Sequence, residues 1–187
     1  MSAPVVVGIS GASGAAIGVE ALRLLARAQV EVHAVVTEAG QRVIDQELSL
    51  EGDSLAKLAG RLWPVDELSA PIASGTFPTR GMIVAPCSIR TLSAVACCRS
   101  SNLLERAADV TLKQRRPLVL MVREAPLHRG HLRLMLEAAE AGAVILPPVP
   151  AFYAGLSSLQ DLVEQTAARG IAELGIDVGV LRRWNRP

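Results

Sequence analysis

The chain has 187 residues, half of them apolar but only 3% aromatic, and a formal net charge of +1. A chain of this length is typical of a single domain, here residues 1–187, and Ala, Val, Leu and Ile must fill its core because aromatic side chains are scarce. The near balance of 19 basic and 18 acidic residues argues against a dedicated nucleic-acid surface.

Apolar runs that suit strands alternate with helical patterns along the chain. The predicted strands are Val5–Ile9, Val30–Val36, Met82–Ala85, Leu118–Val122 and Ala143–Leu146. The predicted helices are Ala15–Ala28, Gln41–Glu47, Leu55–Trp63, Ile89–Ala96, Leu103–Arg115, Leu132–Ala141 and Leu159–Leu174. This alternation predicts an α/β domain with a doubly wound parallel sheet, in which ligands bind beyond the carboxyl ends of the strands. We therefore expect the loops that begin at Gly8, Thr37, Pro86, Arg123 and Pro147 to meet at one site.

The first strand leads into a glycine-rich loop, Gly8-Ile-Ser-Gly-Ala-Ser-Gly14, that precedes the first helix. Bare backbone N–H groups at such a loop can hold a phosphate, and the missing Cβ atoms let a ligand approach closely. Ser10 and Ser13 add hydroxyl donors. The spacing matches neither the dinucleotide fingerprint nor the Walker loop. The loop predicts phosphate binding without specifying the ligand, and a tight turn that binds nothing is the alternative.

A second loop of this kind, Pro86-Cys-Ser-Ile-Arg-Thr91, follows the third predicted strand. Ser88 and Thr91 open a helix there, where hydroxyls either cap free N–H groups or hydrogen-bond a phosphate. Thr37, just after the second strand, can add a third hydroxyl. Two such loops at one edge of the sheet favour a phosphate-bearing cofactor, with ordinary helix capping as the alternative.

Charged residues recur in the third part of the chain. Arg106, Asp109 and Lys113 share one face of a predicted helix, where weak solvated ion pairs are the usual outcome. Arg123 and Glu124 end a buried strand at the predicted site, where charges are costly unless they are paired or functional. Glu124 is therefore a candidate proton carrier, with structural ion pairing as the alternative.

The histidines and cysteines predict neither a metal site nor disulfides. His128 and His131 lack a third ligand at suitable spacing, so we expect helix capping or surface positions for both, and a packed position for His33. Cys97 and Cys98, like Cys87, are expected to be small buried residues. The chain shows no leader pattern and no apolar run long enough for a membrane span, which favours the cytoplasm.

Two aromatic residues lie near the end of the chain. Tyr153 follows the rigid segment Pro147-Pro-Val-Pro150, which can hold it over a pocket where its hydroxyl donates to a phosphate. Packing in a turn is the alternative. Trp184 is an apolar anchor in a polar tail and is expected to dock on a neighbouring surface.

In combination, the motifs of the chain resemble those of the UbiX-type flavin prenyltransferases. They are Gly8–Gly14, Ala73-Ser-Gly75, Pro86–Thr91, Glu105-Arg-Ala-Ala-Asp-Val110, Lys113-Gln-Arg-Arg-Pro-Leu-Val119, Arg123-Glu-Ala-Pro126 and Pro147-Pro-Val-Pro-Ala-Phe-Tyr153. The resemblance implies a Rossmann-like (flavodoxin-like) fold, a homododecamer, and metal-independent transfer of a dimethylallyl group from dimethylallyl monophosphate to reduced FMN. The product, prenylated FMN, would serve a partner decarboxylase of the UbiD type.

The resemblance also implies roles for individual residues. The expected FMN contacts are Gly11, Ala12, Ser13, Thr37, Ser88, Ile89, Arg90, Thr91 and Arg123. The expected ligands of the dimethylallyl phosphate are Tyr153 and Arg169, assisted by Ser13, Arg106 and Lys113. Glu124 would be the acid–base residue, Glu47 would lie near the flavin and the isoprenoid, and Ser13 would lie between the cofactor and the leaving phosphate. Some members have a tryptophan where this chain has Leu68.

The residue types fit this chemistry even without the family resemblance. Ionisation of an allylic phosphate places negative charge on the leaving group, which Arg, Lys and Tyr donors stabilise. A magnesium-dependent prenyl diphosphate enzyme needs clustered aspartates, and this chain has no such cluster. Two other functions stay open: an FMN-dependent oxidative decarboxylase of the same fold, and a non-catalytic FMN carrier.

Overall fold

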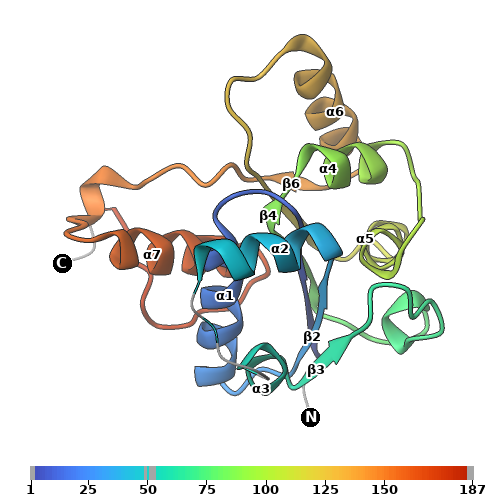
Figure 1. The fold of residues 1–187 in the computed structure, drawn as a ribbon, viewed down its shortest axis with the longest axis horizontal. Coiled ribbons are helices and arrows are strands. Elements are labelled where there is room, and N and C mark those ends of the chain that lie inside the picture. The colour runs from blue at the N-terminus through green and yellow to red at the C-terminus, as the bar shows by residue number, and fades with distance from the viewer. Residues whose placement is uncertain (1–2, 49, 51–53, 185–187) are drawn as a thin grey trace.

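The computed structural model describes residues 3–48, 50 and 54–184, which form a parallel sheet between two layers of helices (Figure 1). The strands are β1 (Val5–Ile9), β2 (Val32–Val36), β3 (Arg61–Trp63), β4 (Gly81–Cys87), β5 (Leu118–Val122) and β6 (Val144–Ile145). They lie in the order β3-β2-β1-β4-β5-β6, and every neighbouring pair is parallel. The predicted doubly wound α/β architecture is confirmed.

Helices cover both faces of the sheet. One layer contains α1 (Ala15–Arg27), α2 (Glu38–Glu47), α3 (Ser54–Ala59) and α7 (Leu159–Ala172). The other contains α4 (Ile89–Ala96), α5 (Leu103–Lys113) and α6 (Arg129–Glu140). Two short 3-10 turns, η1 (Pro71–Ala73) and η2 (Phe152–Ala154), lie in the long connections. No described helix is long and apolar enough to cross a membrane.

Residues of the central strands alternate between the two cores. Val5, Val7 and Ile9 of β1 pack in the core that contains α1 and α7, whereas Val6 packs in the core that contains α4 and α5. Because both faces are buried, the strands are continuous apolar runs, which is why the sequence pattern locates them well. Among the described residues, the buried core side chains are Ala, Val, Leu, Ile, Met and Cys, as the composition predicts.

One predicted helix is wrong at its end. The pattern from Leu55 to Trp63 predicts a single helix, but α3 stops at Ala59 and residues 61–63 form the edge strand β3. Gly60, with φ +63°, turns the chain there, and Leu62 then pairs with Ala34 of β2. A glycine in the left-handed region is the usual end of a helix, and it decides the boundary here.

The cysteines divide into one buried and two exposed residues. Cys87 ends β4, and its burial raises the pKa of the thiol to about 12, so it is protonated at neutral pH. Cys97 and Cys98 are exposed, which contradicts the prediction that they are buried. They follow the last turn of α4, and Cys98 has φ 51°, so the chain turns away from the core at this point.

Helix α1 lies so close to the sheet that only glycine fits at residue 18. A Cβ atom there would overlap the carbonyl oxygen of Ala85 in β4 and crowd Ile9 of β1. Backbone atoms cannot move aside as a side chain can, so the helix itself would have to shift.

Gly18→Ala is therefore expected to lower the free energy of unfolding by about 3 kcal/mol, measured by urea unfolding at a fixed protein concentration. Gly175→Ala is the control, because Gly175 has φ +70° but a Cβ added there would have no neighbouring atom within 4 Å. The control change is expected to cost about 1 kcal/mol of backbone strain. Equal costs at the two positions would contradict close packing of α1 on the sheet.

Candidate active site

A cleft of about 510 Å³ opens at the carboxyl ends of the central strands. Its walls come from the loops after β1, β2, β4 and β5, represented by Gly11, Thr37, Ser88 and Glu124. Four of the five loops expected at one site therefore meet. The fifth does not line this cleft, because Pro147 lines a separate and smaller hollow.

Three helices, α2, α4 and α5, begin at this cleft, and hydroxyl side chains cap the first two. The Thr37 hydroxyl caps α2 by accepting a hydrogen bond from the Gly40 N–H at 3.0 Å. The Ser88 hydroxyl caps α4 by accepting from the Thr91 N–H at 3.3 Å and donates to the Thr91 hydroxyl at 3.1 Å. Ser88 thus caps a helix, as its alternative states, and Thr37 does the same. This arrangement aims the positive ends of these helices at one cleft, a setting that favours an anion.

The Ser10 side chain hydrogen-bonds the glycine-rich loop Gly8–Gly14 to the loop Pro86–Thr91. Its hydroxyl donates to the Pro86 carbonyl oxygen at 2.9 Å and accepts from the Ser88 N–H at 2.8 Å. The side chain is buried, so it is not the free donor to a ligand that the sequence suggests. It instead fixes the distance between the two loops that form the cleft.

The N-terminus of α1 holds a carboxylate of the chain itself. Glu47, the last residue of α2, accepts hydrogen bonds from the Gly14 N–H at 2.9 and 3.1 Å and from the Ala15 N–H at 3.0 Å. Burial raises the pKa of Glu47, but the hydrogen bonds from Ser13, Gly14 and Ala15 and the charge of Arg123 outweigh it, and the net pKa is lowered. Glu47 is therefore ionised at neutral pH.

The lowered pKa makes stability depend on pH. Above the pKa that the carboxyl has in the unfolded chain, the ionised form stabilises the fold, and this contribution is lost as the pH falls through the folded pKa. Glu47→Gln is expected to cost about 1 kcal/mol at pH 7, a value discounted because the residue is exposed. The cost should disappear in acid.

Urea unfolding of Glu47→Gln and of the unchanged chain across this pH range measures the effect. The control is Asp45→Asn, which removes an exposed carboxylate of the same helix whose partner is the Gln41 amide. A cost that is the same at every pH would contradict a stabilising Glu47 carboxylate.

Glu124 is available for chemistry. It lines the cleft, is exposed, and accepts a hydrogen bond from the Ala125 N–H at 3.0 Å. Within residues 3–48, 50 and 54–184 it forms no ion pair, so the structural alternative for this carboxylate finds no support. Arg123 does not line the cleft; its N–H donates to the Cys87 carbonyl oxygen at 3.0 Å, and its charge acts on Glu47.

The hollow of about 50 Å³ contains two of the expected phosphate ligands. Tyr153 in η2 and Arg169 on α7 both line it, together with Arg182, a residue for which the sequence predicts no role at the site. Arg169 also pairs with Glu173 at 2.5 Å. Trp184 packs its ring edge-on against Tyr153 with 5.2 Å between centroids, so the surface on which it docks in this chain is Tyr153.

Arg106 and Lys113 line neither the cleft nor the hollow. Arg106 donates to the Ala73 carbonyl oxygen at 3.2 Å and pairs with Asp109 at 3.0 Å, as the helical spacing predicts. Lys113 is the last residue of α5, close to the amino end of β5, and is exposed. The cleft opens at the opposite edge of the sheet, so one chain does not bring Lys113 to its own cleft.

The other residues expected to contact FMN also divide into those that line the cleft and those that do not. Ile89, Arg90 and Thr91 line the cleft, whereas Ala12 and Ser13 do not. Ser13 instead hydrogen-bonds Glu47 at the rim of the glycine loop. Leu68 is exposed between β3 and η1 and lines neither the cleft nor the hollow.

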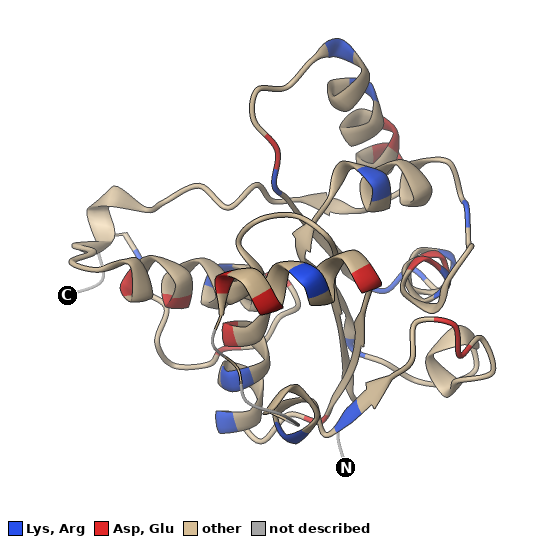
Figure 2. Ribbon diagram, in the orientation of Figure 1, with Lys and Arg blue, Asp and Glu red and all other residues tan. Residues whose placement is uncertain are grey.

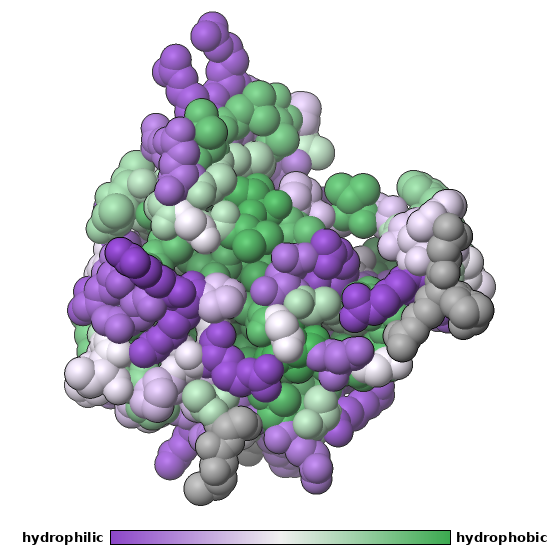
Figure 3. Space-filling view, turned by 180° about the vertical axis from the view of Figure 1, so that it is seen from behind, coloured by the Kyte–Doolittle hydropathy of each residue, from purple (hydrophilic) through white to green (hydrophobic). Residues whose placement is uncertain are grey.

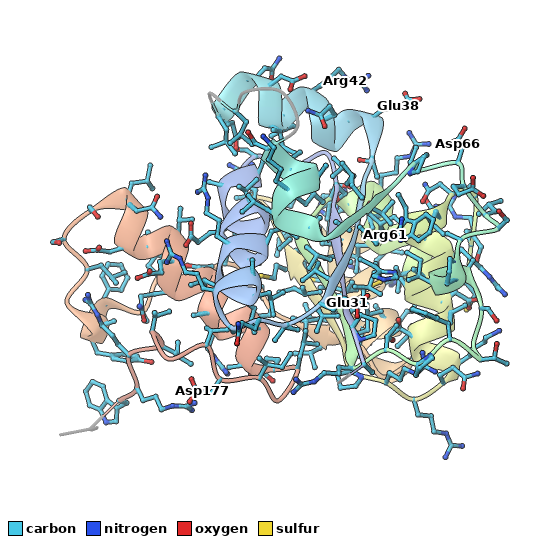
Figure 4. All side chains as sticks on the ribbon, turned by 90° about the horizontal axis from the view of Figure 1, so that it is seen from below. Glu31, Glu38, Arg42, Arg61, Asp66 and Asp177 are labelled. Atoms are coloured by element: carbon cyan, nitrogen blue, oxygen red, sulfur yellow. The ribbon has the colours of Figure 1, made fainter. Side chains whose placement is uncertain are left out.

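The cleft also has walls that the motifs do not indicate. They are Glu38, Ala39, Arg42, Val65, Ser101, Asn102 and Glu105. Glu38 and Arg42 project from α2, one helical turn apart (Figure 4). Helix-capping residues are the sequence signal that could have predicted these lining residues. Helix α2 begins right after Thr37, and Asn102 caps α5 by accepting a hydrogen bond from the Glu105 N–H at 2.9 Å.

Two of the three histidines have structural partners. His128 caps α6 by accepting from the Gly130 N–H at 3.0 Å, and buried His33 accepts from the Trp63 indole N–H at 3.2 Å, in agreement with the positions expected for them. His131 does not cap a helix as expected: it is half-buried on α6, its ring centroid lies 3.6 Å from that of His128, and its buried Nδ1 atom has no hydrogen-bond partner among the described residues. In the part of the chain that the structure describes, no three His, Cys, Asp or Glu residues are grouped so that they could hold a metal ion.

Comparison with known proteins identifies the family. A family model described as Flavoprotein matches residues 1–170. The flavin prenyltransferase UbiX of Thauera aromatica is 49% identical over 180 residues, which cover 96% of this chain and 93% of that protein. The solved structure of AnUbiX (PadA1) with FMN and dimethylallyl pyrophosphate has a TM-score of 0.96 and 41% identity, covering 100% of this chain and 99% of that one. A dodecameric FMN-dependent UbiX-like decarboxylase from Escherichia coli O157:H7 has a TM-score of 0.93 and 38% identity, covering 98% and 100%. The chain therefore belongs to the UbiX flavin prenyltransferase family.

Proposed function

We propose that this protein transfers a dimethylallyl group from dimethylallyl monophosphate to reduced FMN and releases prenylated FMN. The observation that carries the proposal is a pair of hollows beyond the strand ends: a cleft at the N-termini of α2, α4 and α5, and a smaller hollow lined by Tyr153, Arg169 and Arg182. AnUbiX, solved in complex with FMN and dimethylallyl pyrophosphate, supports a site that takes a flavin and an isoprenoid phosphate together.

The residues of the cleft fit FMN. Its volume of about 510 Å³ is in the range of cofactor pockets. The helix ends capped by Thr37 and Ser88 suit the dianionic phosphate, and Ile89 offers an apolar wall. At Gly11 an added Cβ would overlap the side chain of Ala39, so this wall has no room for a larger residue. We propose that these residues hold the flavin together with Gly11, Arg90 and Thr91 of the cleft. We also propose flavin contacts for Ala12, Ser13 and Arg123, which do not line the cleft but lie within two residues of Gly11 or Glu124 in the chain.

The residues of the hollow suit the departing phosphate. As the carbon–oxygen bond of the allylic phosphate breaks, negative charge grows on the leaving group, and the Tyr153 hydroxyl and Arg169 guanidinium donate hydrogen bonds to it. When bound, reduced FMN supplies the electron-rich ring system that accepts the allyl group. Glu124, at the cleft, takes up or delivers the protons that ring closure moves.

Glu47 and Ser13 act between the two parts of the site. The Glu47 carboxylate is ionised at neutral pH, so its charge stabilises positive charge that develops on the allyl fragment. The Ser13 hydroxyl hydrogen-bonds this carboxylate and keeps its orientation. Hydrogen bonds at the N-terminus of α1 hold the Glu47 carboxylate, and the Ser13 hydroxyl that bonds it, in place before any ligand binds.

We further propose that the protein works as a homo-oligomer in which another copy supplies Arg106 and Lys113. Large apolar side chains of α6, of the segment after β6 and of the start of α7 are exposed: Leu132, Leu136, Val149, Phe152 and Leu159. Figure 3 shows apolar surface that runs from the projecting α6 over the centre of one face. Basic and acidic residues are interspersed along the described ribbon (Figure 2). The dodecameric relative of Escherichia coli supports assembly of this chain as well.

The product defines the partner class. Prenylated FMN is a modified cofactor, so an enzyme that uses it must follow, and the family resemblance points to a decarboxylase of the UbiD type. Transfer to such an enzyme is part of the proposal, and the cytoplasm stays the predicted location.

Anaerobic incubation with reduced FMN and dimethylallyl monophosphate tests the reaction. Mass spectrometry should detect FMN with one added dimethylallyl unit. Bound FMN without this adduct would favour the carrier function. Flavin reduction by a substrate that contains cysteine would favour the oxidative decarboxylase instead.

A further inference from the structure

The segment that carries Tyr153 makes few internal interactions that could fix its conformation. Residues 146–160 contain no charged side chain, and 53% of Tyr153 and 87% of Phe152 is exposed. Within the segment, η2 has two backbone hydrogen bonds, from the Ala154 N–H to Ala151 at 2.9 Å and from the Gly155 N–H to Phe152 at 3.4 Å. A phenol that must meet a small phosphate precisely therefore needs support from elsewhere in the chain.

We infer that Arg182 is a positioning residue, which holds Tyr153 over the hollow by clamping the backbone of η2. This inference rests on the proposed function, because it assigns the clamp to the site that would take the isoprenoid phosphate. The Arg182 Nη1 atom donates to the carbonyl oxygens of Ala154 at 2.6 Å and Gly155 at 3.2 Å, the two residues that follow Tyr153. Across the described ranges, Arg182 provides the only side-chain donors to carbonyl oxygens of residues 151–156.

The clamp is anchored in helix α7. The Arg182 backbone N–H donates to Gln165 Oε1 at 2.8 Å, and Gln165 Nε2 donates to the Val180 carbonyl oxygen at 2.8 Å. Gln165 is buried and lies one helical turn before Arg169. The same helix thus fixes Arg169 directly and Tyr153 through Arg182, so the two phosphate ligands keep their mutual position.

Groups around the clamp support the same geometry. The Asp161 carboxylate accepts from the Ser157 N–H at 2.9 Å and from its hydroxyl at 2.7 Å, which closes the loop between η2 and α7. These hydrogen bonds, and more weakly the charge of Arg182, lower the pKa of Asp161, so it is ionised near Arg182 at neutral pH. On the other side, the Trp184 ring meets the Tyr153 ring at 86°.

The neighbouring arginine provides a matched control. Arg183 belongs to the same segment and carries the same charge, but among the described residues its only partner is Asp177, an exposed carboxylate that Figure 4 labels, at 3.8 Å. Removal of Arg183 changes the net charge as removal of Arg182 does, without touching η2.

The test uses the FMN-loaded protein and calorimetric titration with dimethylallyl monophosphate. Arg182→Ala is expected to weaken binding by about tenfold or more, the loss typical of charge-assisted hydrogen bonds, and Arg182→Lys should recover part of it. Arg183→Ala should bind as the unchanged chain does. FMN affinity, measured by flavin fluorescence, should be the same in all of them.

A double-mutant cycle separates positioning from direct binding. If Arg182 acts through Tyr153, then adding Arg182→Ala to Tyr153→Phe should weaken binding no further. Independent, additive losses would show that Arg182 binds the phosphate itself and would overturn the inference. Weaker FMN binding in Arg182→Ala would also overturn it, since the effect would then be a general loss of structure.

A spectroscopic signal reports the position of Tyr153 without any ligand. The chain has a single tyrosine, so ¹⁹F NMR of protein labelled with 3-fluorotyrosine observes this ring alone. Its resonance should move in Arg182→Ala and stay in place in Arg183→Ala; an unmoved resonance in Arg182→Ala would contradict the clamp. Because this signal needs no turnover, the clamp can be verified even if no prenylated FMN forms, and the proposed function alone would then fail.

Discussion

Glu124→Gln is expected to lower the turnover rate by a factor of about 10² to 10⁴ and to leave FMN binding unchanged. The amide has nearly the same shape as the carboxyl group but can neither accept nor release a proton at neutral pH. Because Glu124 is exposed and forms no ion pair among the described residues, the change should leave stability within about 0.5 kcal/mol. Anaerobic single-turnover assays, with the product quantified by mass spectrometry, measure the loss.

Glu137→Gln is the control for this experiment, because Glu137 is an exposed carboxylate on α6 outside the cleft and the hollow. It should keep full activity. Full activity in Glu124→Gln would exclude this residue as the proton carrier. Equal flavin binding by both variants, with turnover lost in one, would separate a transferase from a carrier.

The fold was predictable because its signals are local. Strands buried on both faces produce apolar runs such as Val5–Ile9 and Leu118–Val122, and these two predicted strands coincide with β1 and β5. The predicted starts at Gln41 and Leu132 are each three residues late, because the apolar pattern begins only after the first turns of α2 and α6. The larger errors fall where a single residue outweighs the pattern. Gly60 ends α3 and converts residues 61–63 into an edge strand, and the turn at Cys98 carries two cysteines out of the core.

The site was predictable where it depends on topology. Parallel strands bring the ends of β1, β2, β4 and β5 to one edge, so loops far apart in the sequence share a cleft. The role of each hydroxyl was not predictable. Ser10 and Ser13 look alike in the sequence, but burial turns Ser10 into a link between loops, whereas exposed Ser13 meets Glu47.

Long-range pairings were beyond a single sequence. Nothing in the local pattern indicates that Glu47 reaches the Gly14 N–H, 33 residues earlier, or that Arg182 reaches the backbone beside Tyr153. Both contacts depend on where the ends of helices α2 and α7 lie after folding. The glycine loop consequently differs from a simple phosphate cradle: in this chain it presents an ionised carboxylate to the site.

Lys113→Ala is expected to lower turnover by about 10²-fold, although Lys113 lines neither the cleft nor the hollow of its own chain, because in the proposed assembly a lysine of another copy completes the hollow. Lys113 lies at the end of α5, near the amino end of β5, so it is far from the cleft of its own chain. A loss of turnover in this variant would therefore report on the assembly of several copies. Arg106→Ala should have a smaller effect, since Arg106 is already bound to Ala73 and Asp109.

Mixed assemblies decide whether Lys113 acts between copies. Lys113→Ala and Glu124→Gln are each expected to keep about 1% of the turnover or less, but when the two chains are co-expressed, some sites combine an intact Glu124 with an intact Lys113 from a neighbour. Random assembly makes about one quarter of the sites complete, so turnover should return to about that fraction. Co-expression of Glu124→Gln with Glu124→Ala cannot restore any site and is the control. If the first mixture stays as inactive as the control, Lys113 does not act across a subunit interface, and each chain must be functional or non-functional by itself.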